Sequence, residues 1–295
     1  MSFFSGVFVA VLTPFNAQSE FKADSYEKFI GHLFDRGVHG LYVCGVAGEG
    51  LLMSPEEREE VAEVAITASR GRGKVIIHVG SGNTRDSVRL AKHASSIGAA
   101  AVGCLPPHIG NYGIASLIEH YRRVAEAACP LPLFVYYSPQ VAPSLGNFGL
   151  LERLLDMKEI SGLKFTGTDA SELAYAIYER SRRQTVLIGV DEMFMASLLM
   201  GAQGAIAALA NIVPGLFVQI YEAAKSQCWS EANELQRRLV QVGRIVERYP
   251  FLSGLKTVAG WQGYELGEPR PPNLVLSSSE RLALREALEP LGVIS

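Results

Sequence analysis

The stretch KVIIHVGSGNTRDSVRLAKHASSIGAAAVGCL, residues 74–105, contains one complete unit of a pattern that runs along the chain. It begins with a mostly apolar run, Lys74–Val79, continues with an amphipathic segment, Thr84–Ile97, and ends with another apolar run, Ala100–Leu105. Continuous apolar runs are typical of parallel strands buried on both faces, and the segment between them has helical periodicity. The stretch therefore predicts a strand, a helix and a second, parallel strand.

The same alternation extends over residues 1–229. The other apolar runs are Gly6–Leu12, Gly40–Cys44, Leu133–Tyr137, Ile160–Lys164, Thr185–Gly189 and Gly204–Ala208. The other amphipathic segments are Ser25–Arg36, Ser54–Arg70, Ile114–Ala128, Phe148–Asp156, Ser171–Arg180, Met193–Met200 and a last one from Pro214 to about Gln227. Eight strand–helix units in one domain predict an α/β fold, the (β/α)8 TIM barrel, with a doubly wound parallel sheet as the alternative.

Residues 230–295 have only helical patterns, over Ser230–Glu247, Phe251–Ala259 and Ser279–Leu288. We expect them to form a C-terminal helical extension that packs on the barrel, so that the chain is a single domain overall.

Composition excludes several classes of protein. The 295 residues are 48% hydrophobic and 19% charged, which is typical of a globular chain with a large core. The chain has 27 basic and 30 acidic residues, which gives a net charge of −3. We therefore expect neither nucleic acid nor an anionic membrane as a partner. The apolar N-terminus has no basic residue ahead of it, which argues against a signal peptide, and no apolar run is long enough to span a membrane.

Cysteines and histidines show no metal-binding spacing. The cysteines lie far apart, which indicates reduced thiols in a cytoplasmic protein. The six histidines contain no HxH or HExxH motif, so we expect no metal site and place most of them at the surface.

Lys164 is the sharpest candidate for catalysis, because the functional groups of a barrel lie at the C-terminal ends of its strands. It closes the run Ile160–Lys164. A desolvated amine loses its proton more readily than an exposed one and can attack carbonyl groups. The alternative is a lysine that marks the exit of the strand into water.

Other strand ends carry further candidates. Tyr136 can transfer protons to a bound carbonyl group, or can be a core aromatic. Asp191 and Glu192 can bind substrate hydroxyls, or can serve as the N-cap and a first-turn acid of the next helix. The loop Gly45–Gly50 has three glycines, which let backbone amides approach an anion, although a plain turn fits equally well.

These residues match motifs of a known family. The chain resembles the dihydrodipicolinate synthase/N-acetylneuraminate lyase (DapA-like) family of class I, Schiff-base aldolases. Gly45–Glu49 is similar to the family's GxxGE loop, Tyr136 and Pro139 to its YNxP motif, and Lys164 to the lysine of its GxK segment. The segments most similar to N-acetylneuraminate lyases are Ile77–Gly80, Leu90–Ala94, Gly162–Phe165 and Gly189–Glu192.

The resemblance implies a role for each matching residue. Lys164 would form an imine with a pyruvate-type 2-oxo acid, and Tyr136 would move protons. The backbone amides of Val46 and Ala47 would hold the substrate carboxylate. The residues at the positions that bind the hydroxylated tail of sialic acid are Thr166, Gly189, Asp191 and Glu192. No metal and no diffusible cofactor would be needed, the partners would be a small 2-oxo acid and an aldehyde, and the chain would form a homo-oligomer, a tetramer or a dimer.

Several positions depart from the family pattern. Val46 and Ala47 replace the hydroxyl residues of the loop. Ile109 and Gly110 stand where a neighbouring subunit's tyrosine is expected. Val141 replaces the arginine of dihydrodipicolinate synthases, and Ala208 replaces a sugar-binding serine of the lyases.

We therefore predict a Schiff-base carbon–carbon lyase or aldolase most similar to N-acetylneuraminate lyase. Dihydrodipicolinate synthase and a 2-oxo-3-deoxy sugar acid aldolase or dehydratase are the alternatives within the same chemistry. The alternative from another class is a catalytically degenerate barrel that binds a 2-oxo acid without turnover.

Overall fold

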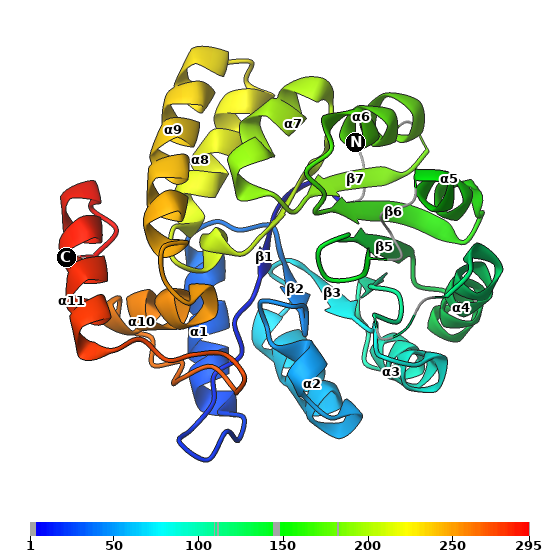
Figure 1. Ribbon diagram of the computed structural model, residues 1–295, viewed down its shortest axis with the longest axis horizontal. Helices are drawn as coiled ribbons and strands as arrows, with labels where there is room; N and C mark the ends of the chain where they lie inside the picture. The colour runs from blue at the N-terminus through cyan, green and yellow to red at the C-terminus, as the bar shows by residue number, and fades with distance from the viewer. Residues whose placement is uncertain (1–3, 109, 111, 144–147, 182, 295) are drawn as a thin grey trace.

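The computed structural model describes residues 4–108, 110, 112–143, 148–181 and 183–294. Within them, eight parallel strands follow each other in chain order and close into a barrel when β8 pairs with β1 (Figure 1). The strands are β1 (Gly6–Ala10), β2 (Gly40–Val43), β3 (Lys74–His78), β4 (Ala101–Cys104), β5 (Leu133–Tyr137), β6 (Ile160–Phe165), β7 (Thr185–Ile188) and β8 (Gly204–Ala207). The predicted barrel is confirmed, and the doubly wound alternative is wrong.

Helices surround the barrel because each amphipathic segment buries its apolar side against the strands. These helices are α1 (Ala23–Asp35), α2 (Pro55–Ser69), α3 (Thr84–Ser96), α4 (Ile114–Ala128), α5 (Phe148–Asp156), α6 (Ala170–Tyr175), α7 (Phe194–Met200) and α8 (Pro214–Lys225). A π-helical turn, Ala176–Arg180, continues α6, and a 3-10 turn, Asp191–Met193, precedes α7. The predicted segments Ser171–Arg180 and Met193–Met200 are therefore each helical but not uniformly α-helical.

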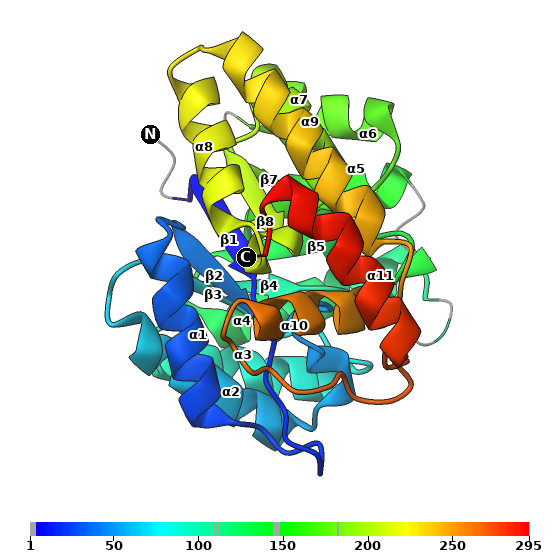
Figure 2. The same ribbon diagram turned by 90° about the vertical axis from the view of Figure 1, so that its left-hand side faces the viewer.

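Three more helices follow the barrel: α9 (Trp229–Val246), α10 (Phe251–Trp261) and α11 (Ser278–Leu288). Helix α9 packs along α8, and α11 packs on α9 (Figure 2). Helix α10 is almost entirely buried over Ser253–Ala259, so this extension contributes to the same core as the barrel. No helix among the described residues is long and apolar enough to cross a bilayer.

Candidate active site

Lys164 and Tyr136 lie side by side at the C-terminal end of the barrel. They are register partners on the paired strands β6 and β5. The Lys164 Nζ atom lies 3.8 Å from the centroid of the Tyr136 ring. Both residues are buried, with 5% and 4% of their surfaces exposed. The alternative of a lysine that simply leads the strand into water is therefore wrong, and the phenol is placed beside the amine.

Tyr42 and His78 complete an aromatic enclosure around this amine. The centroid of the fully buried Tyr42 ring lies 4.6 Å from Lys164 Nζ. The Tyr136 ring stands edge-on to both, at centroid distances of 6.0 Å from Tyr42 and 5.9 Å from His78. Electron-rich ring faces attract an ammonium group, so the enclosure holds the amine in place. The sequence analysis did not select Tyr42, because an aromatic residue inside an apolar strand has the pattern of an ordinary core residue.

His78 is a neutral histidine that joins strand ends. The Leu105 amide donates to its Nε2 (3.2 Å), and its Nδ1 donates to the Cys44 carbonyl oxygen (3.0 Å). Burial, together with the positive charges of Arg58 and Lys164, holds the His78 pKa well below its usual value. Since backbone groups occupy both ring nitrogens, His78 positions the ends of β2 and β4 and has no free nitrogen for proton transfer.

The expectation that most histidines lie at the surface fails for two of the six. His78 and His120 are buried, and the other four are partly buried. The Nδ1 atom of His120 forms a hydrogen bond with Thr84 Oγ1 (3.0 Å), and its Nε2 atom lies 3.5 Å from the Cys104 sulfur. Burial lowers its pKa to about 4, so it is a neutral core residue between α3 and α4. Within the described part of the chain, no cluster of histidine, cysteine or acidic side chains is suited to a metal ion.

The glycine-rich loop after β2 has backbone amides that are available to a ligand. The amides of Glu49 and Gly50 bond within the loop, to the carbonyl oxygens of Val46 and Gly45. Among the described residues, the amides of Val46 and Ala47 have no acceptor. Their side chains are partly buried and pack against the core. Two adjacent free amides suit a carboxylate, which supports the predicted role of this loop.

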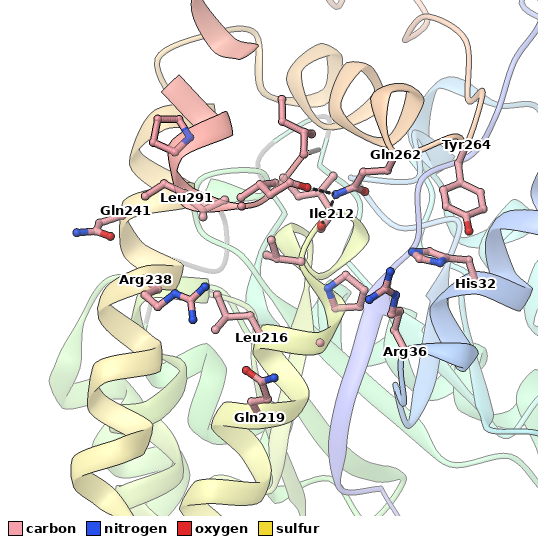
Figure 3. A pocket seen from close by; sticks show the side chains of 18 residues that line it. His32, Arg36, Ile212, Leu216, Gln219, Arg238, Gln241, Gln262, Tyr264 and Leu291 are labelled. Carbon is pink, nitrogen blue, oxygen red and sulfur yellow. Dashed lines mark hydrogen bonds between the residues drawn. The ribbon is translucent and has the colours of Figure 1, made fainter. Parts of the chain in front are cut away.

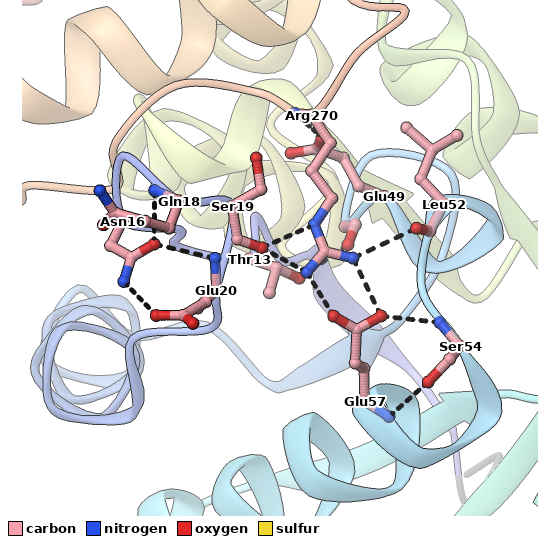
Figure 4. Close-up of polar contacts among 11 residues, drawn as sticks. Thr13, Asn16, Gln18, Ser19, Glu20, Glu49, Leu52, Ser54, Glu57 and Arg270 are labelled. Carbon is pink, nitrogen blue, oxygen red and sulfur yellow. Dashed lines mark hydrogen bonds and ion pairs between the residues drawn. The ribbon is translucent and has the colours of Figure 1, made fainter.

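A buried ion pair holds this loop from the far end of the chain. Glu49 Oε1 lies 2.7 Å from Lys256 Nζ on α10, and at most 1% of either side chain is exposed. Glu49 Oε2 accepts the Arg270 amide (2.6 Å), while the Arg270 guanidinium pairs with Glu57 on α2 (Figure 4). Burial lowers the pKa of the Lys256 amine, and the Glu49 carboxylate opposes that shift. The C-terminal extension thereby fixes the position of the loop that carries the free amides.

Gly189 and Thr166 lie next to the Lys164 side chain. A Cβ atom on Gly189 would lie 2.2 Å from Thr166 Oγ1 and 3.1 Å from Lys164 Cε, so only glycine leaves room for both side chains. The buried Thr166 hydroxyl has no hydrogen-bond partner among the described residues. A buried hydroxyl without a partner is costly, so it is a candidate group for a substrate hydroxyl.

Replacing Gly189 by alanine should therefore strain the site. We expect Gly189→Ala to lower the free energy of unfolding by about 1–3 kcal/mol through overpacking. Gly260→Ala on α10, where an added Cβ meets no atom within 4 Å, is the matched control and should not destabilise the protein. Urea denaturation of both variants measures the difference, and equal stabilities would refute the close packing around Gly189.

Asp191 does not cap its own helical turn, so the N-cap interpretation is wrong. Val190 occupies that position, and Asp191 Oδ2 instead accepts the Leu209 amide (3.0 Å) from the segment after β8. Burial raises the pKa of Asp191 to about 7, with a smaller contribution from Glu192. Partly buried Ala208 lies directly before Leu209, so the ends of β7 and β8 are brought together.

The structure bears differently on two of the positions that depart from the family pattern, Ile109 and Val141. Ile109 lies outside the described residues. Tyr112, the next tyrosine along the chain, is 40% exposed. Val141 follows β5, and its amide donates to the Ser138 carbonyl oxygen (3.1 Å). Because this residue is a valine, it supplies no cation at the position where the resemblance leads us to expect an arginine.

A buried lysine between the rings of Tyr42 and Tyr136 at the C-terminal end of the barrel is consistent with the resemblance in the sequence. The profile of the Dihydrodipicolinate synthetase family matches residues 3–291. The chain belongs to this family. The predicted family and its enzyme class, carbon–carbon lyases, are thereby confirmed.

Relatives in this family carry more than one name. An N-acetylneuraminate lyase of Rhizobium meliloti is 32% identical over 290 residues, covering 97% of this chain and 95% of the relative. A 4-hydroxy-tetrahydrodipicolinate synthase of Exiguobacterium sp. is 30% identical over 299 residues, covering 99% of both chains. A solved structure of a prophage protein from E. coli K12 in complex with pyruvate superposes with a TM-score of 0.93 at 26% identity, covering 99% of this chain and all of that one.

Proposed function

We propose that the protein forms an imine between Lys164 and a pyruvate-type 2-oxo acid, and makes or breaks a carbon–carbon bond on that imine. The observation that carries the proposal is the contact between the buried Lys164 amine and the Tyr136 ring, at 3.8 Å from Nζ to the centroid. A structural lysine would need a carboxylate or other acceptor, whereas this amine lies among aromatic rings at the mouth of the barrel.

The chemistry follows from these groups. The Lys164 amine attacks the ketone carbon, and the carbinolamine loses water to give the protonated imine. Tyr136 donates the proton that lets the water depart and takes up the proton released when the bond to the aldehyde carbon breaks. The electron pair of that bond flows into the imine, so the reaction needs no metal and no diffusible cofactor. The Val46 and Ala47 amides bind the substrate carboxylate.

The proposed substrate is a 2-oxo acid with a hydroxylated tail, of the N-acetylneuraminate type. Thr166 supplies a buried hydroxyl that has no partner among the described residues, and Asp191 and Glu192 supply acceptors close to Gly189 in the sequence. The name of the Rhizobium meliloti relative supports this choice. Val141 leaves no cation for a second carboxylate, so dihydrodipicolinate synthesis is disfavoured. We further propose a cytoplasmic homo-oligomer, a tetramer or a dimer, from the same resemblance.

Release of pyruvate tests the substrate assignment. N-acetylneuraminate and a 2-oxo-3-deoxy sugar acid are each incubated with the protein, and pyruvate is followed with lactate dehydrogenase. We expect turnover of a hydroxylated substrate, and no condensation of pyruvate with aspartate semialdehyde. Absence of turnover on every substrate, with an intact imine, would favour the 2-oxo acid binding barrel, which the apolar Val46 and Ala47 make the second candidate.

Restoring hydroxyls in the loop should increase activity toward pyruvate. In Val46→Thr with Ala47→Thr, two recovered hydrogen bonds to the carboxylate would add about 3–6 kcal/mol at most. We expect tighter pyruvate binding and faster imine formation at Lys164, measured by rapid borohydride quenching. Thermal denaturation of the same variant is the control. A stably folded variant without faster imine formation would show that the loop side chains do not limit the reaction.

A further inference from the structure

A cavity lies outside the barrel, away from the candidate active site. It has a volume of about 750 Å³ and lies between α1, the start of α8, α9 and the C-terminal residues 290–294 (Figure 3). None of the residues assigned to the imine site lines it. Its size falls within the range of small-molecule sites, so it is large enough for a metabolite.

The charge of this cavity is positive. No acidic side chain is among its described lining residues. Arg36, directly after α1, and Arg238 on α9 extend into it from opposite sides (Figure 3). Within the part of the chain that the structure describes, neither guanidinium forms an ion pair. By contrast, the guanidinium of Arg237, the residue before Arg238, lies 3.7 Å from the Glu234 carboxylate. Guanidinium groups match carboxylate and phosphate oxygens, so the cavity is suited to an anion.

The start of α8 adds donors to the same wall. This helix has 12 residues and begins at Pro214, and Val213 provides no side-chain cap. The Gly215 amide has no acceptor among the described residues. The free amides and the dipole of a helix N-terminus favour negative charge, and here they line a cavity that already contains two arginines.

Gln262 adds an acceptor. Its Nε2 donates to the carbonyl oxygens of Ile212 and Val293, both at 2.8 Å, and so ties the two walls together. Its Oε1 is buried and has no donor among the described residues. Such an oxygen needs a donor, which a ligand hydroxyl supplies and a bare anion does not.

We propose that this cavity binds a small hydroxylated organic anion, either a sugar phosphate or a sugar acid. Arg36, Arg238 and the start of α8 hold its acidic group. Gln262 Oε1 accepts a hydrogen bond from one of its hydroxyls. Ile212, which lines the same wall, supplies apolar contact to the carbon skeleton.

Calorimetric titration tests this proposal in a Lys164→Ala background, where no imine can form. The probes are glucose 6-phosphate and gluconate, with inorganic phosphate and glucose as the partial ligands. We expect at least one of the two hydroxylated anions to bind with a Kd below about 1 mM. Arg36→Gln and Arg238→Gln should each weaken that binding by about tenfold or more. The matched control is Arg237→Gln, at the residue next to Arg238 on α9, and it should leave the Kd unchanged.

Three results would overturn the proposal. The first is no binding of either hydroxylated anion up to about 10 mM. The second is binding that survives Arg36→Gln and Arg238→Gln, or that Arg237→Gln weakens equally. The third is equally tight binding of inorganic phosphate, which would leave Gln262 without a role. All of these results are independent of the imine at Lys164.

Discussion

Tyr136→Phe should slow proton transfer at the candidate active site by about 10²–10⁴-fold, the usual contribution of a positioned acid–base group. The substitution keeps the ring that lies 3.8 Å from Lys164 Nζ and removes only the hydroxyl. The fold and the position of the amine should therefore be retained. Exchange of the pyruvate methyl protons with deuterium, followed by NMR, measures this step without knowledge of the aldehyde partner.

Tyr137 provides a matched control for this variant. It is the next residue on β5, and its hydroxyl donates to Glu172 (2.6 Å) instead of facing the amine. Tyr137→Phe should leave the exchange rate within about threefold of the wild type. If both variants exchange pyruvate protons at the wild-type rate, Tyr136 is only a wall of the site and another group moves the proton.

Lys256→Met should be among the most destabilising single substitutions in the chain. It leaves the Glu49 carboxylate buried without its partner, and breaking a buried pair in this way costs about 3–5 kcal/mol. The loop that carries the free amides of Val46 and Ala47 should loosen at the same time, so that pyruvate binds more weakly. Urea denaturation and pyruvate titration of the same variant measure both effects.

Further variants separate the ion pair from general effects of losing a lysine. Lys225→Met removes a surface partner of Glu222, where the ammonium lies 3.6 Å away and half exposed, and should cost less than about 1 kcal/mol. Glu49→Gln combined with Lys256→Met removes both charges and should recover part of the lost stability. With Glu49→Gln also measured alone, a double variant whose loss of stability equals the sum of the losses in Glu49→Gln and Lys256→Met would show that the pair has no coupling.

The barrel and the position of Lys164 at the end of a strand could be predicted from local sequence, because both depend on local patterns. Apolar runs alternating with amphipathic segments identify strands and helices, and a lysine at the end of such a run must lie at the mouth of the barrel. The run ending at Lys164 and the paired run ending at Tyr136 are sufficient for this inference. Asp191 shows the limit of local rules, since its carboxylate bonds to Leu209 on the next strand–helix unit.

The rest of the site depends on contacts that no local pattern encodes. Glu49 and Lys256 are joined only in the folded chain, and the sequence around Lys256 has the pattern of an ordinary apolar helix. Most of the six histidines are expected at the surface because histidine is usually polar and exposed, yet His78 is buried. Its burial depends on the Cys44 carbonyl and the Leu105 amide, which satisfy both ring nitrogens.

Reductive trapping of the imine tests the central claim most directly. The protein is incubated with pyruvate, 2-oxobutyrate or N-acetylneuraminate, treated with sodium borohydride, and examined by intact mass and peptide mapping. We predict one reduced adduct per chain with at least one of these acids, located on Lys164 and absent from Lys164→Arg. An unchanged mass with all three acids, or an adduct that persists in Lys164→Arg, would contradict the assignment of Lys164 as the imine-forming residue.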